Sequence, residues 1–376
     1  MTKGARQRHD CAMQLSSTLS WLVDRAAESA GADRLLAELG AHLVADGLPL
    51  AGGALTLDVP HPLIALRTWL WRAGNGEVIE ALGFAPGDPL AISDKKPSEG
   101  AGRQWLAGIS NGIVHEDTIG PLRDGPTLAW IGPRAFTPQE IDQLHQAARF
   151  AAAPLAVLAV RATMTAALEA YLGKRSAARV MAAPLRRNVG ETIQAALLFA
   201  DLRGFTALSE ANPPTMVIAA LDAWFDRIAG AVHAFGGEVL KFIGDGILAI
   251  FPVSGETPRG ACDAALRAVS AARAGMAHLD QARSKQGLQP LPFGAALHLG
   301  EILWGNVGAA DRLDFTAIGP AVNLVSRLEG LCKPLGKTVL VSGALAAETN
   351  TPLVALGTHE LRGIASACAV FALRED

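Results

Sequence analysis

The sequence predicts a mixed α/β fold in at least two domains, and three observations support this prediction. The chain has 376 residues, whereas single domains usually run to about 100–200 residues. Half of the residues are hydrophobic and 18% are charged, which is an ordinary globular balance and disfavours a disordered chain. From residue 192 onward, short apolar strand-like segments alternate with longer amphipathic segments, as they do when helices pack on a sheet.

Charge and hydropathy exclude several classes of protein. A formal net charge of −3 disfavours a polybasic nucleic-acid binder. The nearest approach to a membrane helix, Phe150 to Val160, is eleven residues long and contains Pro154, whereas a span needs about 20 apolar residues. No secretion signal follows the charged N-terminus, and the four cysteines form no disulfide or zinc pattern. We therefore expect a cytoplasmic protein without nucleic-acid binding or a membrane span.

The first part of the chain predicts a separate α/β unit. Leucines and alanines recur at helical spacing between Leu22 and Leu39. Strands are expected at residues 54–57 and 68–71, with turn-forming glycine, proline and aspartate at 60–62, 74–76, 86–89 and 93–102.

A strand ending at Ile131 precedes a long helix with a well-defined start. Thr137 is the expected N-cap, Pro138 the first helical residue and Glu140 the third, which together form a capping box. A strand followed by such a closing helix resembles the last part of a GAF sensor domain. An unrelated α/β unit that ends in a capped helix explains the pattern equally well.

The second half predicts the order βαββαβ, which is that of a ferredoxin-like core. Strands are expected at 193–200, 238–243, 247–251, 293–302 and 338–342, and helices at 213–233, 258–282 and from Pro320. Between the two halves, residues 163–180 are expected to continue the preceding helix, with a break near 184–190.

Two carboxylates are expected at strand ends. Asp201 closes an apolar strand, and Asp245 lies between Gly244 and Gly246 at the tip of a hairpin. Carboxylate oxygens are ligands for hard divalent cations, which also bind a triphosphate. The alternative is a helix cap for Asp201 and a turn residue for Asp245.

Three further features suit a nucleotide. Gly204, Phe205 and Thr206 stand at a helix start, where backbone amides can approach phosphates. Lys241 lies inside an apolar strand, where it could donate to a purine nitrogen. Asn323 and Arg327 share one helix face, where they could hold a ribose and a pentacoordinate phosphorus. Taken singly, Lys241 could instead reach solvent with its tip, and Asn323 with Arg327 could form an exposed helix face.

Three ordered segments together resemble the class III adenylate/guanylate cyclases. They are residues 199–210 (FADLRGFTALSE), 235–251 (FGGEVLKFIGDGILAIF) and 314–329 (DFTAIGPAVNLVSRLE). The resemblance covers about residues 192–374. It implies that Asp201 and Asp245 bind two Mg²⁺ or Mn²⁺ ions and that Lys241 and Thr316 contact the base. It also implies that Asn323 orients the ribose, that Arg327 stabilises the transition state, and that Arg362 takes the place of a triphosphate-binding lysine.

The resemblance also implies an assembly and a substrate. In this family the metal-binding aspartates come from one subunit and the Asn/Arg pair from the other, so a head-to-tail homodimer is expected. Lys241 with Thr316 resembles the adenine-specific pattern of the threonine subgroup, which favours ATP over GTP. Phe315 and Pro320 stand where many relatives have Tyr and Asp, and a bicarbonate response is not predicted.

The sequence therefore predicts an adenylate cyclase that converts ATP to 3′,5′-cyclic AMP and pyrophosphate. Its expected parts are a regulatory domain (1–162) with an unknown effector, a helical linker (163–190) and a catalytic domain (191–376). The alternatives are a guanylate cyclase and a catalytically silent nucleotide-binding module. Diguanylate synthesis is disfavoured because Val239 follows Gly-Gly-Glu in place of an acidic-aromatic continuation.

Overall fold

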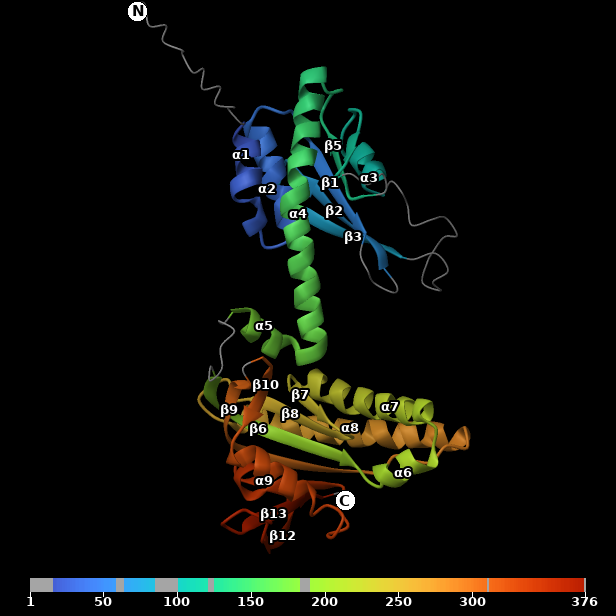
Figure 1. Ribbon diagram of the computed structural model, residues 1–376, viewed down its shortest axis with the longest axis vertical. Helices are drawn as coiled ribbons and strands as arrows, with labels where there is room; N and C mark the ends of the chain where they lie inside the picture. The colour runs from blue at the N-terminus through green and yellow to red at the C-terminus, as the bar shows by residue number, and fades with distance from the viewer. Residues whose placement is uncertain are drawn as a thin grey trace, which may run out of the picture. The chain divides into compact units, whose positions relative to one another are not determined.

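The computed structural model describes residues 16–58, 64–84, 101–120, 125–182, 190–309 and 311–374. The chain packs into two compact units, residues 1–164 (unit 1) and 165–376 (unit 2) (Figure 1). Cys11, the turns expected at 60–62 and 86–89, and most of the regions 93–102 and 184–190 lie outside the described residues.

Unit 1 contains an antiparallel five-stranded sheet in the order β3-β2-β1-β5-β4. Its strands are β1 (Gly52–Asp58), β2 (Ile64–Arg72), β3 (Val78–Phe84), β4 (His115–Thr118) and β5 (Thr127–Ile131). Its helices are α1 (Ser17–Asp24), η1 (Ala26–Glu28), α2 (Ala32–Ala45), α3 (Ala101–Ile109) and α4 (Pro138–Leu172), of which α4 runs on past residue 164.

The two faces of this sheet are covered by different helices. Leu55 packs with the buried residues of α1, α2 and α4, whereas its neighbour Ala54 packs with Leu106 of α3. This alternation is the period of two that a strand imposes. The strands expected at 54–57 and 68–71 are confirmed as the paired β1 and β2.

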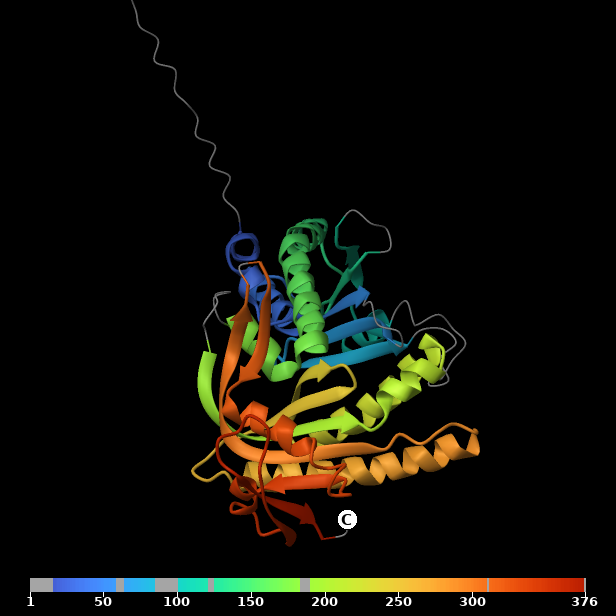
Figure 2. The ribbon, with the colours of Figure 1, turned by 60° about the horizontal axis from the view of Figure 1, so that its bottom comes forward.

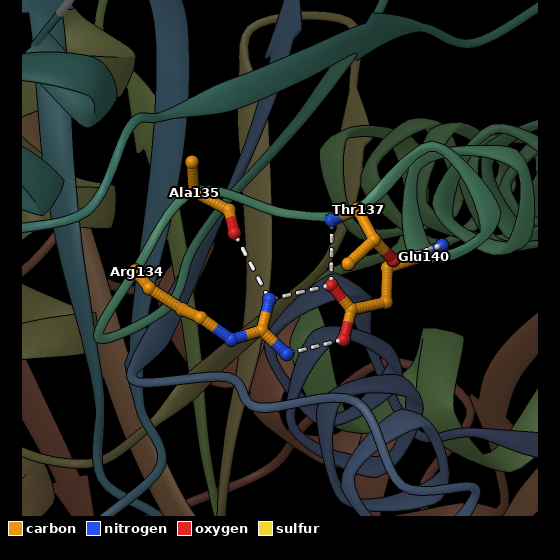
Figure 3. A network of polar contacts seen from close by, with 4 residues as sticks. All are labelled: Arg134, Ala135, Thr137 and Glu140. Carbon is orange, nitrogen blue, oxygen red and sulfur yellow. Dashed lines mark hydrogen bonds and ion pairs between the residues drawn. The ribbon is translucent and has the colours of Figure 1, made fainter.

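The predicted capping box at the start of α4 is confirmed (Figure 3). The backbone N–H of Thr137 donates to Glu140 Oε2 at 2.7 Å, and the Glu140 N–H donates to Thr137 Oγ1 at 3.3 Å. Arg134 adds two hydrogen bonds to the same carboxylate, each 2.9 Å long. The hydrogen bonds from Arg134 and Thr137 lower the pKa of Glu140 to about 2.

The helix does not continue to residue 180 as predicted. It ends at Leu172 because Gly173 adopts a left-handed conformation with φ 82°, and a new helix, α5 (Lys174–Ala182), follows. Among the described residues, α4 alone is long and apolar enough to cross a membrane by length and composition. This is weak support for a span, because core helices pass the same test, and Leu144, Leu155 and Leu158 belong to the unit 1 core.

Unit 2 is built on an eight-stranded sheet in the order β12-β13-β11-β9-β6-β8-β7, with β10 paired to β9 (Figure 2). Its strands are β6 (Gly190–Leu202), β7 (Glu238–Ile243), β8 (Gly246–Pro252), β9 (Phe293–Gly308), β10 (Leu313–Ile318), β11 (Val339–Ser342), β12 (Leu353–His359) and β13 (Cys368–Leu373). Besides α5, its helices are α6 (Phe205–Ala211), α7 (Pro214–Ala234), α8 (Arg259–Lys285), α9 (Pro320–Glu329) and α10 (Gly343–Ala346).

The four central strands have the ferredoxin-like arrangement that the sequence predicted. Within β9-β6-β8-β7, each neighbouring pair is antiparallel, and the sequence-order pattern 4-1-3-2 is that of a βαββαβ core. Successive residues of β6 face opposite layers: Leu198 packs with α7 and α8, whereas Leu197 packs with α9. The sheet is therefore buried on both faces.

His298 is a buried titratable group in this sheet. Its Nδ1 atom lies 2.8 Å from Ser342 Oγ, and burial lowers its pKa to about 4. Between pH 6.5 and 4, His298 binds a proton in the unfolded chain but not in the folded chain. The free energy of unfolding therefore decreases as the pH falls through this range. The loss reaches about 3 kcal/mol at the acid end.

We expect His298→Asn to remove this part of the acid sensitivity, because the amide keeps a polar partner for Ser342 but does not titrate in this range. Urea unfolding of both proteins from pH 7 to pH 4 measures the effect. An equally steep loss of the free energy of unfolding in the two proteins would contradict the assignment.

Candidate functional site

Asp201 and Asp245 lie side by side at one end of the unit 2 sheet. Pairing between β6 and β8 ends at Ala200 and Ile247, next to both aspartates. The Asp245 turn is held by Trp224, whose Nε1 donates to the Asp245 carbonyl oxygen at 2.9 Å. The carboxyl groups share a hydrogen bond, and burial, that bond and the charge of Asp245 raise the pKa of Asp201 to about 7. Without a cation, the pair therefore retains a proton near neutral pH.

Glu329, at the end of α9, is a third carboxylate near this pair. Burial raises its pKa, the charge of Arg203 opposes that rise, and the charge of Asp245 adds to it. Gly294 leaves the space for this side chain, since a Cβ there would meet Glu329 Oε1 at 2.2 Å. Glu329 was not predicted as a site residue, because only the fold brings the end of α9 to the aspartates. Across the described residues, no three His, Cys, Asp or Glu side chains form a metal-binding group.

Lys241 and Thr316 come from neighbouring elements. The Lys241 ammonium forms an ion pair and hydrogen bond with Asp314 of β10. Thr316 lies two residues after Asp314, so both belong to the same face of that strand. The structure thus brings Lys241 to the face of β10 that carries Thr316. Asp314 was missed as a functional candidate, because its partner is 73 residues away in the sequence.

The remaining predicted residues lie on α9, after β12 and at the start of α6. Asn323 and Arg327 are exposed on α9, opposite its buried residues Val325 and Leu328. Arg362 is exposed in the connection between β12 and β13. Gly204 precedes α6 with φ 76°, and the partly buried Phe205 packs against the core beneath α7 and α8.

The helix α5 is held to the sheet by a buried carboxylate. Glu238, the first residue of β7, is 4% exposed. Its Oε1 accepts hydrogen bonds from the Ser176 backbone N–H at 2.9 Å and from Ser176 Oγ at 2.6 Å, and its Oε2 accepts from the Arg175 N–H at 3.2 Å. These backbone donors belong to the first turn of α5, where a negative charge also interacts favourably with the helix dipole. Glu238 therefore caps a helix that lies 62 residues earlier in the chain.

A second contact joins α5 to β9. The Arg179 guanidinium lies 4.4 Å from the centre of the Trp304 ring and forms a 2.6 Å ion pair with Glu191. Trp304 also packs edge-on against Phe315 of β10. The helix α5 thus contacts the strand pair that carries Thr316.

We expect Glu238→Gln to lower the free energy of unfolding of the protein by about 1–3 kcal/mol, because an amide nitrogen would face backbone donors that need an acceptor. Amide exchange in residues 174–182 should accelerate as α5 loosens. Glu191→Gln is the matched control, since losing its exposed ion pair costs less than about 1 kcal/mol. Equal effects of the two substitutions on stability and exchange would show that Glu238 does not hold the helix.

Comparisons with known proteins identify the family of the second part of the chain. Residues 189–370 match the family model of the adenylate and guanylate cyclase catalytic domain. The second part of this chain therefore belongs to the class III adenylate/guanylate cyclase family, as the sequence motifs predicted.

Curated relatives match the same part of the chain. Adenylate cyclase 1 of Rhizobium meliloti is 33% identical over 176 residues, which are 46% of this chain and 26% of that protein. The adenylate cyclase of Anabaena cylindrica is 33% identical over 169 residues, 44% of this chain and 32% of that protein. The matched region thus spans about a quarter to a third of these relatives.

A solved structure shares the fold over a longer stretch. The structure of a bacterial light-regulated adenylyl cyclase superposes with a TM-score of 0.51 at 20% identity, covering 70% of this chain and 86% of that chain. This likeness supports the α/β architecture. The GAF resemblance of unit 1 stays a prediction.

Proposed function

We propose that the protein is an adenylate cyclase that converts ATP to 3′,5′-cyclic AMP and pyrophosphate. The observation that carries this proposal is the pairing of Asp201 with Asp245 in a cyclase catalytic domain that also presents Lys241 beside the strand of Thr316. The relatives named adenylate cyclase add support for ATP as the substrate.

Asp201 and Asp245 suit Mg²⁺ or Mn²⁺. Their oxygens are hard ligands, and the raised pKa of Asp201 is what two carboxylates in one place produce when no cation separates them. When bound, two divalent ions would offset the triphosphate charge and ease loss of the ribose hydroxyl proton. Two carboxylates make an incomplete ligand set, which phosphate oxygens would complete.

The other residues would position the nucleotide. Lys241 and Thr316 contact the adenine, and Asn323 orients the ribose so that its 3′-oxygen faces the α-phosphorus. Arg327 stabilises the negative charge that develops there. As the 3′-hydroxyl releases its proton to water, the bond from the 3′-oxygen to the α-phosphorus forms, the bond from that phosphorus to the bridging oxygen breaks, and pyrophosphate leaves. Backbone amides at residues 204–206 and the Arg362 side chain would hold the phosphates.

We propose that two copies of the chain form the sites head to tail. Asn323 and Arg327 are exposed on α9, which suits a role in a partner's site. Leu303, Val307 and Ile318 are between 37% and 44% exposed, and the register puts them on the face of β9 and β10 that carries Thr316. An exposed apolar face beside catalytic residues favours an interface between subunits.

Unit 1 would regulate this reaction through α5, with residues 1–162 as regulatory domain, 163–190 as linker and 191–376 as catalytic domain. The contacts of Glu238 and Arg179 support this coupling. We further propose a cytoplasmic location and no nucleic-acid partner. The effector is not identified.

The base-contacting pair offers the sharpest test of substrate identity. In the wild type, we expect cyclic AMP from ATP to exceed cyclic GMP from GTP at equal concentrations. Lys241→Glu with Thr316→Cys should shift the ratio of the two kcat/KM values towards GTP by more than about tenfold, since each mismatched hydrogen bond costs about 1–3 kcal/mol. An unchanged ratio would remove these residues from base recognition, and a wild type that prefers GTP would favour the guanylate cyclase.

A further inference from the structure

The helices α1, η1 and α2 border a hollow of about 790 Å³ on unit 1. This volume falls within the range of small-molecule sites, which usually measure about 300–1,000 Å³. The helix α1 lines the hollow with Trp21 and Asp24, and α2 lines it with Arg34, Glu38 and His42. Residues three or four apart share one helix face. A polar stripe on each helix therefore borders the same hollow.

The two charged side chains that α2 contributes are not paired with each other. Glu38 Oε2 instead accepts a hydrogen bond from the buried Ser29 Oγ at 2.7 Å. Within the part of the chain that the structure describes, the Arg34 guanidinium has neither a hydrogen bond nor an ion pair. Arg34 is therefore available to an anionic group, and the second oxygen of Glu38 is available to a cationic one.

An aromatic wall stands beside these charges. The Trp21 and His42 rings are stacked, with centroids 4.7 Å apart and an interplanar angle of 25°. His42 lies four residues after Glu38, which is about 6 Å further along the helix axis. Along α2, the hollow therefore presents first a guanidinium, then a carboxylate and then an aromatic surface.

We propose that this hollow, hereafter the α1–α2 site, binds an aromatic α-amino acid. The ligand carboxylate pairs with the Arg34 guanidinium, which can donate two parallel hydrogen bonds. The ligand ammonium lies against Glu38 and Asp24, and its ring packs on the Trp21–His42 wall. An α-amino acid carries its two charges on one carbon, and side chains four apart on a helix have Cβ atoms only about 5–6 Å apart.

The mixed charge of the lining favours a zwitterion over an ion of one sign. The carboxylates of Asp24, Glu28 and Glu38 border the hollow, and so do the guanidiniums of Arg25 and Arg34. A simple anion would be repelled by the first group, and a simple cation by the second. A ligand that carries both charges can satisfy both groups at once.

The α1–α2 site is connected to α4 through η1. Glu28 of η1 borders the hollow, and its neighbour Ala27 accepts a 2.6 Å hydrogen bond from Arg161 Nη1 of α4 through its carbonyl oxygen. A ligand that orders η1 should therefore also affect α4. Regulation of the reaction by this ligand rests on the proposed function, whereas binding of the ligand does not.

Calorimetric titration of the full-length protein with L-phenylalanine, L-tyrosine and L-tryptophan tests the ligand class. We expect at least one of them to bind at millimolar concentration or below. Three analogues each lack one recognised part: 3-phenylpropionate lacks the ammonium, 2-phenylethylamine the carboxylate and L-alanine the ring. Each should bind at least about tenfold more weakly. No binding of any of the three amino acids, or an analogue that binds as tightly, would overturn the proposal.

A pair of arginine variants tests the location. Arg34→Gln should raise the dissociation constant of the bound amino acid at least about tenfold. Arg149→Gln, which replaces an exposed arginine of α4 outside the hollow, should leave it unchanged. Both residues are exposed, and equal melting temperatures without ligand would show that both variants are folded. Wild-type affinity in Arg34→Gln would overturn the proposal. Because binding is measured without turnover, this result does not depend on whether the protein is a cyclase.

Amide hydrogen exchange tests the connection to α4. Saturation with the bound amino acid should slow exchange in η1 and in α4 around Arg161. In Arg161→Gln, the slowing should remain in η1 and be lost in α4. Unchanged exchange in α4 of the saturated wild type would overturn the connection.

Discussion

Replacing Asp245 by Asn is expected to lower cyclic AMP formation about 1,000-fold or more. The substitution keeps the shape of the side chain but removes one of two carboxylates that would hold the divalent ions. Losing their charge stabilisation costs several kcal/mol, and each 1.4 kcal/mol is a factor of ten in rate. Asp226→Asn, which alters an exposed aspartate of α7, is the matched control and should leave the rate unchanged.

The Asp245→Asn substitution is also expected to change how the stability of the metal-free protein depends on pH. A carboxyl whose pKa is raised to about 7 holds a proton in the folded state that the unfolded chain has already released, so stability falls as the pH rises from about 4 to 7. In the metal-free protein, Asp245→Asn should weaken that fall, because the charge of Asp245 no longer acts on Asp201. Thermal unfolding at pH 5 and pH 8 in a chelator measures this.

Adding Mn²⁺ at pH 8 should raise the Tm of the wild type and not that of the Asp245→Asn variant. A variant that keeps substantial activity, or that gains as much thermal stability from Mn²⁺ as the wild type, would show that this carboxylate does not bind the metal.

Replacing Arg327 by Ala is expected to lower the rate about 100- to 1,000-fold, which is the effect of losing one transition-state donor. Because Arg327 is exposed and its site would lie in the partner subunit, we also expect two inactive chains to complement each other. An inactive Arg327→Ala chain mixed with an inactive Asp245→Asn chain should regain activity. In a two-fold dimer, half of the dimers would be mixed and each would hold one intact site, so recovery should approach about a quarter of the wild-type rate.

The mixing experiment has its own control. Co-purification of the two variants, each carrying a different affinity tag, reports whether subunits exchange. If exchange is demonstrated and the two inactive variants together remain inactive, the two residues act within one chain, and the head-to-tail arrangement is wrong.

Features that depend on local sequence could be predicted. The start of α4 follows from Thr137, Pro138 and Glu140, and all its expected hydrogen bonds form. The central strands of unit 2 are apolar runs bounded by aspartate, glycine or proline, so β6, β7 and β8 were predicted near their observed limits. By contrast, the helix end at Gly173 was missed, because a single glycine within a helical pattern is often tolerated.

Features that depend on the fold could not be predicted. Glu238 caps α5, and Asp314 binds Lys241, because the sheet brings together segments that are 62 and 73 residues apart. The last two strands, β12 and β13, were missed because β12 mixes exposed apolar and polar residues without a clear period. The predicted aspartate pair was recognised from sequence motifs, but only the structure shows that the two carboxyl groups share a hydrogen bond.

The most direct test of the central claim is the product formed by the purified full-length protein from ATP and from GTP, in parallel, with Mg²⁺ or Mn²⁺. The account predicts cyclic AMP and equimolar pyrophosphate from ATP, at a higher kcat/KM than cyclic GMP from GTP. No cyclic nucleotide from either substrate, from a protein shown to be dimeric and to bind ATP, would contradict it and identify a catalytically silent nucleotide-binding module.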